Sequence, residues 1–267
     1  MKERPGFPAR LDKDKASPPP KSLLGATRVL TPESPMRPKP LGMPSPAGVG
    51  LDSSAVRARM VKKLADQGVM DVLVLQAMGQ TERHRFVDSA LVNQAYEDTS
   101  LPIGLGQTIS KPNVVARMIE LLRQAPGLKD HGLMGRVLEI GTGCGYQAAV
   151  LSCLALEVYS IERLRGLHDK ARENLRPLRL PNVHVIFGDG MLGYPKGAPY
   201  SAIIAAAGGE DIPLAWLDQL ALGGRIVAPM QTSQGQQALV VIDKTAQGFQ
   251  QTLLEAVNFV PLKSGIA

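Results

Sequence analysis

The sequence predicts an α/β protein with a mostly parallel β-sheet. Between residues 136 and 228, short runs rich in β-branched residues alternate with stretches of helical periodicity, which is the pattern of strand–helix–strand crossover units. After Ala228 two more strand-like runs follow without a long helix between them, so the end of the sheet should include an antiparallel C-terminal strand. The expected strands lie at 136–140, 158–161, 183–187, 202–206, 225–228, 238–242 and 250–260.

A helical N-terminal lead-in precedes these strands. Apolar side chains recur at helical spacing over 56–64 and 72–78, with a break at Gly68. A third helix is expected to begin at Pro112, because proline suits the first turn of a helix and apolar residues follow it at helical spacing. The segment 101–110 is too irregular for a strand or a helix, and we expect a loop that is ordered by what it contacts. A plain linker is the alternative interpretation.

Residues 1–52 differ in composition from the rest of the chain. The first 50 residues hold 11 of the 21 prolines, nine basic side chains and four acidic ones. Such a segment cannot bury enough apolar area to offset its ordering entropy, so we expect a disordered, proline-rich basic tail before a catalytic domain at 53–267. A docking arm that presents the motif at 35–38 is the alternative. The rest of the chain is nearly neutral, which argues against a nucleic-acid partner.

The number of cysteines and the hydropathy of the chain indicate the cellular compartment in which the protein is expected. Two cysteines, Cys144 and Cys153, are too few for the disulfide framework of a secreted protein. No window approaches the roughly 18 to 20 apolar residues of a membrane-spanning helix, and the charges and prolines of the first 20 residues do not suit a signal peptide. We therefore expect a cytoplasmic monomer without a membrane partner. No group of residues has metal-ligand spacing, so no metal site is expected.

A glycine-rich loop follows the first expected strand of the sheet. Glu139 and Ile140 lead into Gly141-Thr142-Gly143-Cys144-Gly145, and a helical stretch begins at Tyr146. Glycines at alternate positions allow a ligand to lie against the backbone at the carboxyl end of the strand. The spacing differs from the GxGxxG of dinucleotide loops, and ExGxGxG is typical of Rossmann-like S-adenosylmethionine-dependent methyltransferases. A tight turn that needs glycine for geometry alone is the alternative.

Acidic residues follow the next two expected strands. Glu162, 17 positions after Gly145, ends the second strand, where a carboxylate can accept hydrogen bonds from both hydroxyls of a ribose. Asp189 stands between Gly188 and Gly190 after the third strand, where it can receive the amino group of adenine. Because ligands of open α/β sheets bind at the carboxyl ends of the strands, these three features predict a site for a nucleoside cofactor.

The motifs together resemble one family, the protein-L-isoaspartate (D-aspartate) O-methyltransferases, over about residues 54–267. The resemblance implies a Rossmann-like class I methyltransferase fold. It also implies methyl transfer from S-adenosyl-L-methionine to the α-carboxylate of L-isoaspartyl and D-aspartyl residues in damaged proteins, which initiates their repair and leaves S-adenosyl-L-homocysteine. The motifs that carry it are FVD at 86–88, LPIGLGQTIS at 101–110, EIGTGCGYQ at 139–147, IER at 161–163, GDG at 188–190, APY at 198–200, LGGR at 222–225 and VNFVPL at 257–262.

The resemblance also implies roles for individual residues, with Ser110 as the catalytic one. The chain departs from the family pattern at Gly208-Gly209, where prolines are usual, and this change can alter the preference for peptides. The residues implied to bind the cofactor are Thr108, Ile109, Ser110, Glu139, Gly141, Gly143, Gly145, Glu162, Arg163, Gly188, Asp189 and Gly190. Those implied to bind the substrate are Ile103, Gly104, Val257, Phe259 and Val260.

The implied acceptor needs no strong general base, because a carboxylate with a pKa near 4 is ionised at neutral pH. We expect Ser110 to donate a hydrogen bond that orients the acceptor. It has no histidine in a recognisable partner position that would make it a nucleophile. Ser110 can also cap the helix that begins at Pro112. We interpret Cys144 as a small packing residue rather than a reactive thiol, and we expect Cys153 in the core.

Two other functions stay open at this point. One is a class I methyltransferase with a different carboxylate acceptor, which the departure at Gly208-Gly209 favours. The other is a non-catalytic module that binds the cofactor or scaffolds a partner, and the intact donor motifs with Ser110 speak against it.

Overall fold

The sheet has seven strands in the order β5-β4-β3-β6-β7-β8-β9. The computed structural model describes residues 54–128 and 132–267, so the tail predicted at 1–52 lies outside the described residues. Strands β3 to β7 are mutually parallel, and β8 runs antiparallel to both β7 and β9, which confirms the predicted α/β class and antiparallel C-terminal pairing. The strands are β3 (Met134–Ile140), β4 (Ala155–Glu162), β5 (Val183–Phe187), β6 (Tyr200–Ala205), β7 (Leu220–Gln231), β8 (Gln237–Thr245) and β9 (Gly248–Val257).

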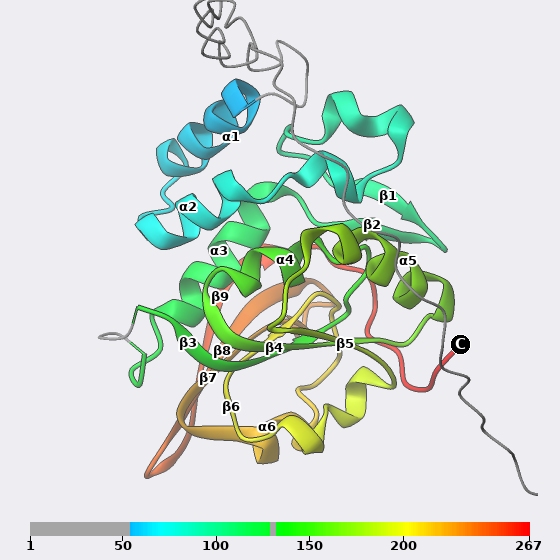
Figure 1. The fold of residues 1–267 in the computed structure, drawn as a ribbon. Coiled ribbons are helices and arrows are strands. Elements are labelled where there is room, and N and C mark those ends of the chain that lie inside the picture. The colour runs from blue at the N-terminus through cyan, green and yellow to red at the C-terminus, as the bar shows by residue number, and fades with distance from the viewer. Residues whose placement is uncertain (1–53, 129–131) are drawn as a thin grey trace, which may run out of the picture. The chain divides into compact units, whose positions relative to one another are not determined.

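Helices cover both faces of the sheet. Figure 1 shows α1 to α5 on one side of the sheet and α6 on the other. The α-helices are α1 (Ser54–Asp66), α2 (Val72–Gln80), α3 (Pro112–Arg123), α4 (Tyr146–Ser152), α5 (Arg165–Leu175) and α6 (Leu214–Gln219). Short 3₁₀ helices lie at Arg83–Phe86, Ser89–Gln94, Arg176–Leu178, Gly190–Leu192 and Pro195–Gly197. The longest helix of the described chain has 13 residues, fewer than the roughly 18 needed to cross a membrane.

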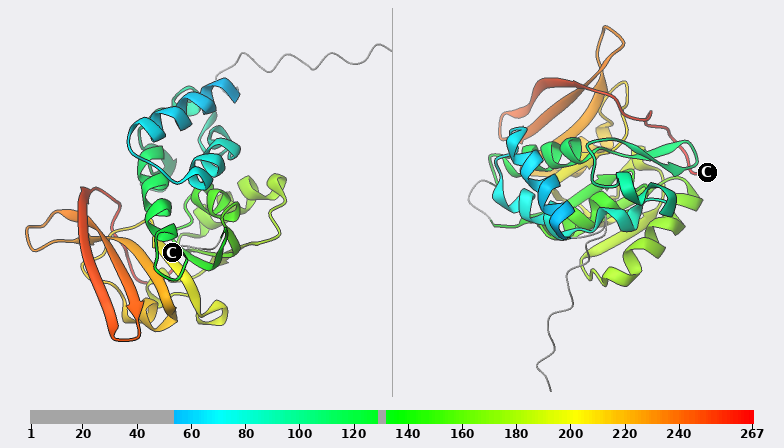
Figure 2. Two further views of the ribbon diagram at one scale, coloured as in Figure 1. Left: turned by 90° about the vertical axis from the view of Figure 1, so that its left-hand side faces the viewer. Right: turned by 90° about the horizontal axis from the view of Figure 1, so that it is seen from above.

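Alternating side chains of the central strand divide the core into two parts. Val137 of β3 packs in a cluster with Met118 and Ile119 of α3, on the side of the helical lead-in. The next residue, Leu138, points to the opposite face and packs in a second cluster with Trp216 of α6. Because both faces are covered, β3 is buried along nearly its whole length, as expected of a central parallel strand. Figure 2 shows the same layers from two further directions.

The prediction of an irregular loop at 101–110 was wrong. The segment forms a two-stranded antiparallel hairpin of β1 (Leu101–Gly104) and β2 (Gln107–Ile109), in which Leu101 pairs with Ile109. Gly104, Leu105 and Gly106 at the turn all have positive φ, at 100°, 52° and 70°, and two of the three are glycines that adopt this conformation without strain. Leu101 and Ile103 are buried on one face of β1, so the hairpin packs through alternating side chains.

The order of the strands fixes where a ligand can bind. The chain proceeds from β3 outward through β4 to β5, then returns to the other side of β3 with β6. The helices that follow β3 and β6 therefore lie on opposite faces of the sheet. A crevice opens between them at the carboxyl ends of these two strands, which is the usual binding position in open α/β sheets.

Candidate active site

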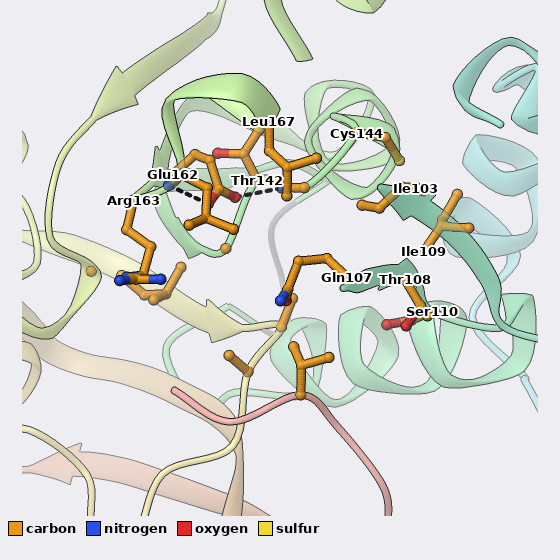
Figure 3. Close-up of a pocket in the computed structure, with 18 of the residues that line it drawn as sticks. Ile103, Gln107, Thr108, Ile109, Ser110, Thr142, Cys144, Glu162, Arg163 and Leu167 are labelled. Carbon is orange, nitrogen blue, oxygen red and sulfur yellow. Dashed lines mark hydrogen bonds between the residues drawn. The ribbon is translucent and has the colours of Figure 1, made fainter. Parts of the chain in front are cut away.

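A cavity of about 470 Å³ lies at the carboxyl ends of β3 and β4. Its walls come from the glycine loop after β3, the turn from β4 to α5, the β1–β2 hairpin and residues 260–263. Figure 3 shows Glu162, Arg163 and Leu167 on one side of it, and Thr108, Ile109 and Ser110 on the other. The volume suits a ligand of nucleoside size, because small-molecule pockets span roughly 300 to 1,000 Å³.

The glycine loop needs glycine at each of its three alternate positions. Gly141, Gly143 and Gly145 have φ values of 90°, 57° and 92°, in the region that side chains disfavour. A Cβ atom at Gly143 would also lie 3.1 Å from the side chain of Ile103, and one at Gly145 would lie 3.0 Å from the side chain of Leu175. The turn therefore requires glycine for its geometry, and Gly141 and Gly143 line the cavity as well.

The hairpin closes one side of the cavity against this loop. The ammonium of Lys170 on α5 donates a hydrogen bond of 2.8 Å to the backbone carbonyl of Ile103. Ile103 itself lines the cavity beside Gly143, whereas Gly104 lines neither of the cavities described here. The specific 101–110 motif is thus a wall of the site, held in place from α5.

Glu162 ties the end of β4 to the glycine loop. One carboxylate oxygen accepts the backbone N–H of Gly143 at 2.9 Å, and the other accepts the backbone N–H of Leu164 at 2.9 Å. The residue is buried and lines the cavity. Since an ionised carboxylate has about four acceptor positions, both oxygens can still accept hydroxyl groups of a ligand.

Glu139 does not reach the cavity. Its side chain is fully buried behind the loop, where it accepts a hydrogen bond from the Ser160 hydroxyl, and Ser160 contacts the Thr142 hydroxyl at 2.6 Å. Burial raises the pKa of Glu139 to about 8, while the Ser160 hydroxyl acts in the opposite direction. Glu139 was predicted to bind the cofactor, but in this structure the strand directs its side chain into the protein and it does not line the cavity.

The turn after β5 contributes its backbone to the site. Gly190 lines the cavity, but Gly188 and Asp189 do not. The Asp189 carboxylate accepts the backbone N–H of Met191 at 2.8 Å and that of Gly265 at 2.6 Å. Two features that the motifs did not reveal complete this wall. The indole of Trp216 donates a 2.8 Å hydrogen bond to the carbonyl of Gly190, and residues 262 and 263 line the cavity.

A second cavity, of about 450 Å³, adjoins the first. It contains three of the predicted substrate-binding residues, Val257, Phe259 and Val260. The two cavities meet along four residues that line both of them, namely Thr108, Ser110, Ala206 and Val260. A group transferred from a ligand in the first cavity to a ligand in the second must cross this junction.

Ser110 stands at the junction with an unused hydroxyl. The side chain is half-buried, and its oxygen has no hydrogen-bond partner among residues 54–128 and 132–267. The capping residue of α3 is Lys111 rather than Ser110, and Ser110 makes no capping hydrogen bond, so the predicted capping role is wrong. The hydroxyl is left to donate to whatever occupies the cavities.

The departure at Gly208 has a structural reason. The backbone N–H of Gly208 donates to Val260 at 2.8 Å, and its carbonyl accepts the N–H of Leu262 at 2.7 Å. A Cβ atom at this position would lie 2.5 Å from the amide nitrogen of Gln237, which in turn donates to the carbonyl of Phe259. Gly208 thus holds the segment 259–262, which forms walls of both cavities.

Three described histidines lie outside both cavities, whereas Cys144 lines the first one. His84 contacts Tyr96, the buried His168 contacts Asp169, and His184 contacts Glu157. No group of residues suited to hold a metal ion occurs in the described part of the chain. Burial raises the pKa of the Cys144 thiol to about 11, which agrees with a packing role. Cys153 is exposed at the end of α4, so its predicted core position is wrong.

Comparisons with known proteins show similarity to one family over most of the chain. The model of the protein-L-isoaspartate(D-aspartate) O-methyltransferase family matches residues 55–267. A protein-L-isoaspartate O-methyltransferase of Methylibium petroleiphilum is 57% identical over 266 residues, covering 98% of this chain and 96% of the relative. One from Leptothrix cholodnii is 62% identical over 221 residues, covering 82% and 77%.

A solved structure named protein-L-isoaspartate O-methyltransferase gives a TM-score of 0.69 at 29% identity, and the match covers 79% of this chain and 67% of that one. The chain belongs to the protein-L-isoaspartate(D-aspartate) O-methyltransferase family.

Proposed function

We propose that the chain transfers a methyl group from S-adenosyl-L-methionine to the α-carboxylate of L-isoaspartyl and D-aspartyl residues in damaged proteins, and so initiates their repair. Family membership supports the reaction. The observation that carries the assignment of the site is the unused Ser110 hydroxyl at the junction of two cavities. The first cavity would hold the methyl donor and the second the peptide.

The residues of the first cavity fit the donor. Glu162 is placed to accept the ribose hydroxyls, and the loop at Gly141 and Gly143 leaves room for a ligand against the backbone. Apolar side chains of Leu164 and Leu167 line the same cavity and suit the uncharged parts of the nucleoside. When bound, the donor supplies an electrophilic methyl group on a sulfonium, and S-adenosyl-L-homocysteine is left after transfer.

The other residues predicted to bind the cofactor would act either by direct contact with it or by shaping the backbone around it. Thr108, Ile109 and Arg163 line the first cavity and would contact the donor directly. Asp189 would act through its turn, because its carboxylate holds the backbone beside Gly190. Gly145 precedes α4 and has a left-handed backbone conformation, through which it would orient the loop.

The reaction requires correct placement of the acceptor and the methyl group rather than a general base. The acceptor carboxylate is ionised at neutral pH, so its oxygen is already a nucleophile. The Ser110 hydroxyl would donate a hydrogen bond that orients this carboxylate or the adjoining amide toward the first cavity. The β1–β2 hairpin and the segment 260–263 border the first cavity, and they would shield the donor from water. Fixing the reacting atoms in line can supply effective molarities of roughly 10⁵ to 10⁸ M.

The remaining features of the proposal concern the whole chain. The catalytic domain comprises residues 53–267, a boundary close to the start of the family match at residue 55. The protein acts in the cytoplasm as a monomer on isoaspartyl-containing proteins and peptides, without nucleic-acid or membrane partners. Its two cysteines, neither of which forms a disulfide, suit a reducing compartment.

Neither alternative function is favoured. The departure at Gly208-Gly209, which favoured a different carboxylate acceptor, is accounted for by the hydrogen bonds of Gly208 to Val260 and Leu262 and by its closeness to Gln237. The intact donor motifs and Ser110 speak against a non-catalytic module. Relatives with 57% and 62% identity carry the isoaspartate methyltransferase name, and the junction keeps its free hydroxyl.

Two synthetic peptides that differ only in an aspartyl or isoaspartyl linkage test the function. The wild-type chain should transfer labelled methyl from S-adenosyl-L-methionine to the isoaspartyl peptide alone, as a base-labile ester. Equal labelling of both peptides, or labelling of neither by a chain that binds the cofactor, would refute the assignment of the acceptor.

A further inference from the structure

The wall of the second cavity contains one charged side chain. This side chain belongs to Lys111, which directly follows Ser110 and precedes the first turn of α3. Its surroundings in the cavity are small, apolar or uncharged polar groups, so a ligand there meets a single positive charge. The full set of lining residues is Ser100, Thr108, Ser110, Lys111, Val114, Ala206, Ala256, Val257, Asn258, Phe259 and Val260.

The ammonium of Lys111 has no carboxylate partner in the described ranges 54–128 and 132–267. The charged side chains of α3 and β9 are all in ion pairs. Arg117 contacts Glu120 at 3.3 Å and Glu255 at 3.0 Å. Asp98 accepts the backbone N–H of Asn113 at 2.9 Å and so meets the first turn of α3. The exposed ammonium is therefore free to attract an anion that enters the cavity.

The position of Lys111 indicates which part of a substrate it meets. Ser110 lines both cavities, whereas Lys111 lines only the second one. The charge thus lies on the acceptor side of the junction, away from the donor cavity. In the proposed reaction the carboxylate at the junction would be held by Ser110, and Lys111 would meet the part of the peptide that continues into the second cavity.

We propose that Lys111 is a specificity-determining residue that favours isoaspartyl peptides with an acidic residue next to the isoaspartyl position. The proposal rests on the proposed function, because it names a preference within that substrate class. An ion pair at the mouth of a water-exposed cavity is weak, and it acts mainly on selectivity. We expect the preference for an acidic over a neutral neighbour to be about two- to fivefold in kcat/KM.

Matched isoaspartyl peptides measure this preference. Each peptide carries Glu, Gln or Lys at the position before or after the isoaspartyl residue, and methyl transfer is followed at low salt. The wild-type protein should prefer Glu over Gln and Gln over Lys at one of the two positions. Lys111→Gln should bring the Glu/Gln ratio near one, and Lys111→Glu should invert the order so that the Lys peptide is preferred. High salt should reduce the wild-type ratio, because it screens the pair.

Lys62→Gln is the control, because it removes the same charge from the exposed surface of α1. This variant should keep the wild-type ratio. A wild-type ratio within twofold of one at both positions, or an unchanged ratio in Lys111→Gln, would overturn the inference. Failure of the wild-type protein to methylate any isoaspartyl peptide would instead overturn the proposed function itself.

Discussion

The carboxylate of Glu162, at the end of β4, accepts the backbone N–H of Gly143 at a distance of 2.9 Å. This hydrogen bond links the ends of two neighbouring strands across the floor of the cavity. The same side chain also accepts the N–H of Leu164 at the start of the following turn. One buried carboxylate therefore shapes the loop that would hold the cofactor and is itself placed to contact it.

Glu162→Gln should lower cofactor affinity and stability together. In the wild type each carboxylate oxygen accepts one backbone N–H, from Gly143 or from Leu164. In the variant an amide NH₂ group replaces one of these oxygens and cannot accept, so one hydrogen bond to a charged group is lost. Such bonds contribute about 1.5 to 3 kcal/mol. We expect a loss of that size in the free energy of unfolding, measured by urea denaturation, and a Kd for S-adenosyl-L-homocysteine raised at least about tenfold, measured by calorimetry.

Glu157→Gln is the matched control for this prediction. It makes the same change on the same strand, but at an exposed carboxylate that contacts His184. Its affinity for S-adenosyl-L-homocysteine should equal that of the wild type. Equal affinities of the Glu162→Gln variant and the wild type would contradict the role given to Glu162.

Trp216→Phe should weaken cofactor binding from the far side of the cavity floor. The indole N–H bonds to the carbonyl of Gly190, which lines the cavity and also accepts the backbone N–H of Gly193 at 3.1 Å, so phenylalanine removes one of the two hydrogen bonds to this carbonyl. We expect a destabilisation of about 0.5 to 1.5 kcal/mol and a several-fold increase in the cofactor Kd. The exposed Leu214 on the same helix gives the control, since Leu214→Ala should change neither quantity.

Trp216 is the single tryptophan of the chain, so the intrinsic fluorescence of the wild-type protein can be used to follow cofactor binding. Its fluorescence should change when S-adenosyl-L-homocysteine is added, with the same midpoint as the calorimetric titration. A signal that stays constant through saturation would mean that Gly190 is not part of the cofactor site.

The buried Glu139 should make stability fall as pH rises from about 4.5 to about 8. Burial raises its pKa from an ordinary value of 4.5 to about 8, so the folded chain keeps a proton that the unfolded chain releases within this window. The contribution of protonated Glu139 to the free energy of unfolding is fully present below pH 4.5. It is lost as pH rises through 8, and the free energy of unfolding falls by up to about 1.4 kcal/mol per pH unit.

Glu139→Gln removes this titration while keeping the shape of the side chain. Urea denaturation of both proteins should be measured between pH 5 and pH 8. The free energy of unfolding of the variant should increase relative to that of the wild type as pH rises. A stability difference that is independent of pH would show that Glu139 does not hold a proton in the folded protein.

The parts of the site that follow a strand were predicted from sequence. Glycines in the spacing ExGxGxG and a carboxylate at Glu162 are local signals, because the end of a parallel strand fixes where the next residues lie. The pattern could not tell which acidic residue faces the ligand. Glu139 is inside a strand buried on both faces, whereas Glu162 ends its strand beside the cavity.

The parts that depend on distant contacts were missed. The hairpin at 101–110 was expected to be irregular, because its strands are short and its turn is rich in glycine. Trp216 reaches Gly190 across 26 positions of sequence, and Gly208 holds the segment near Val260. No local pattern marks such pairs, and only the folded sheet brings them together.

In the proposed reaction, Ser110 orients the acceptor at the junction of the two cavities. Single-turnover methyl transfer to an isoaspartyl peptide by wild type and Ser110→Ala, with the cofactor Kd measured in parallel, tests it most directly. We predict that the rate falls about 10- to 100-fold, since a hydrogen bond to a charged group is lost, while the Kd stays within about twofold. Ser201→Ala, whose hydroxyl bonds to the backbone of Arg136 outside both cavities, should match the wild type. An unchanged rate in Ser110→Ala, or equal losses in rate and cofactor affinity, would contradict the claim.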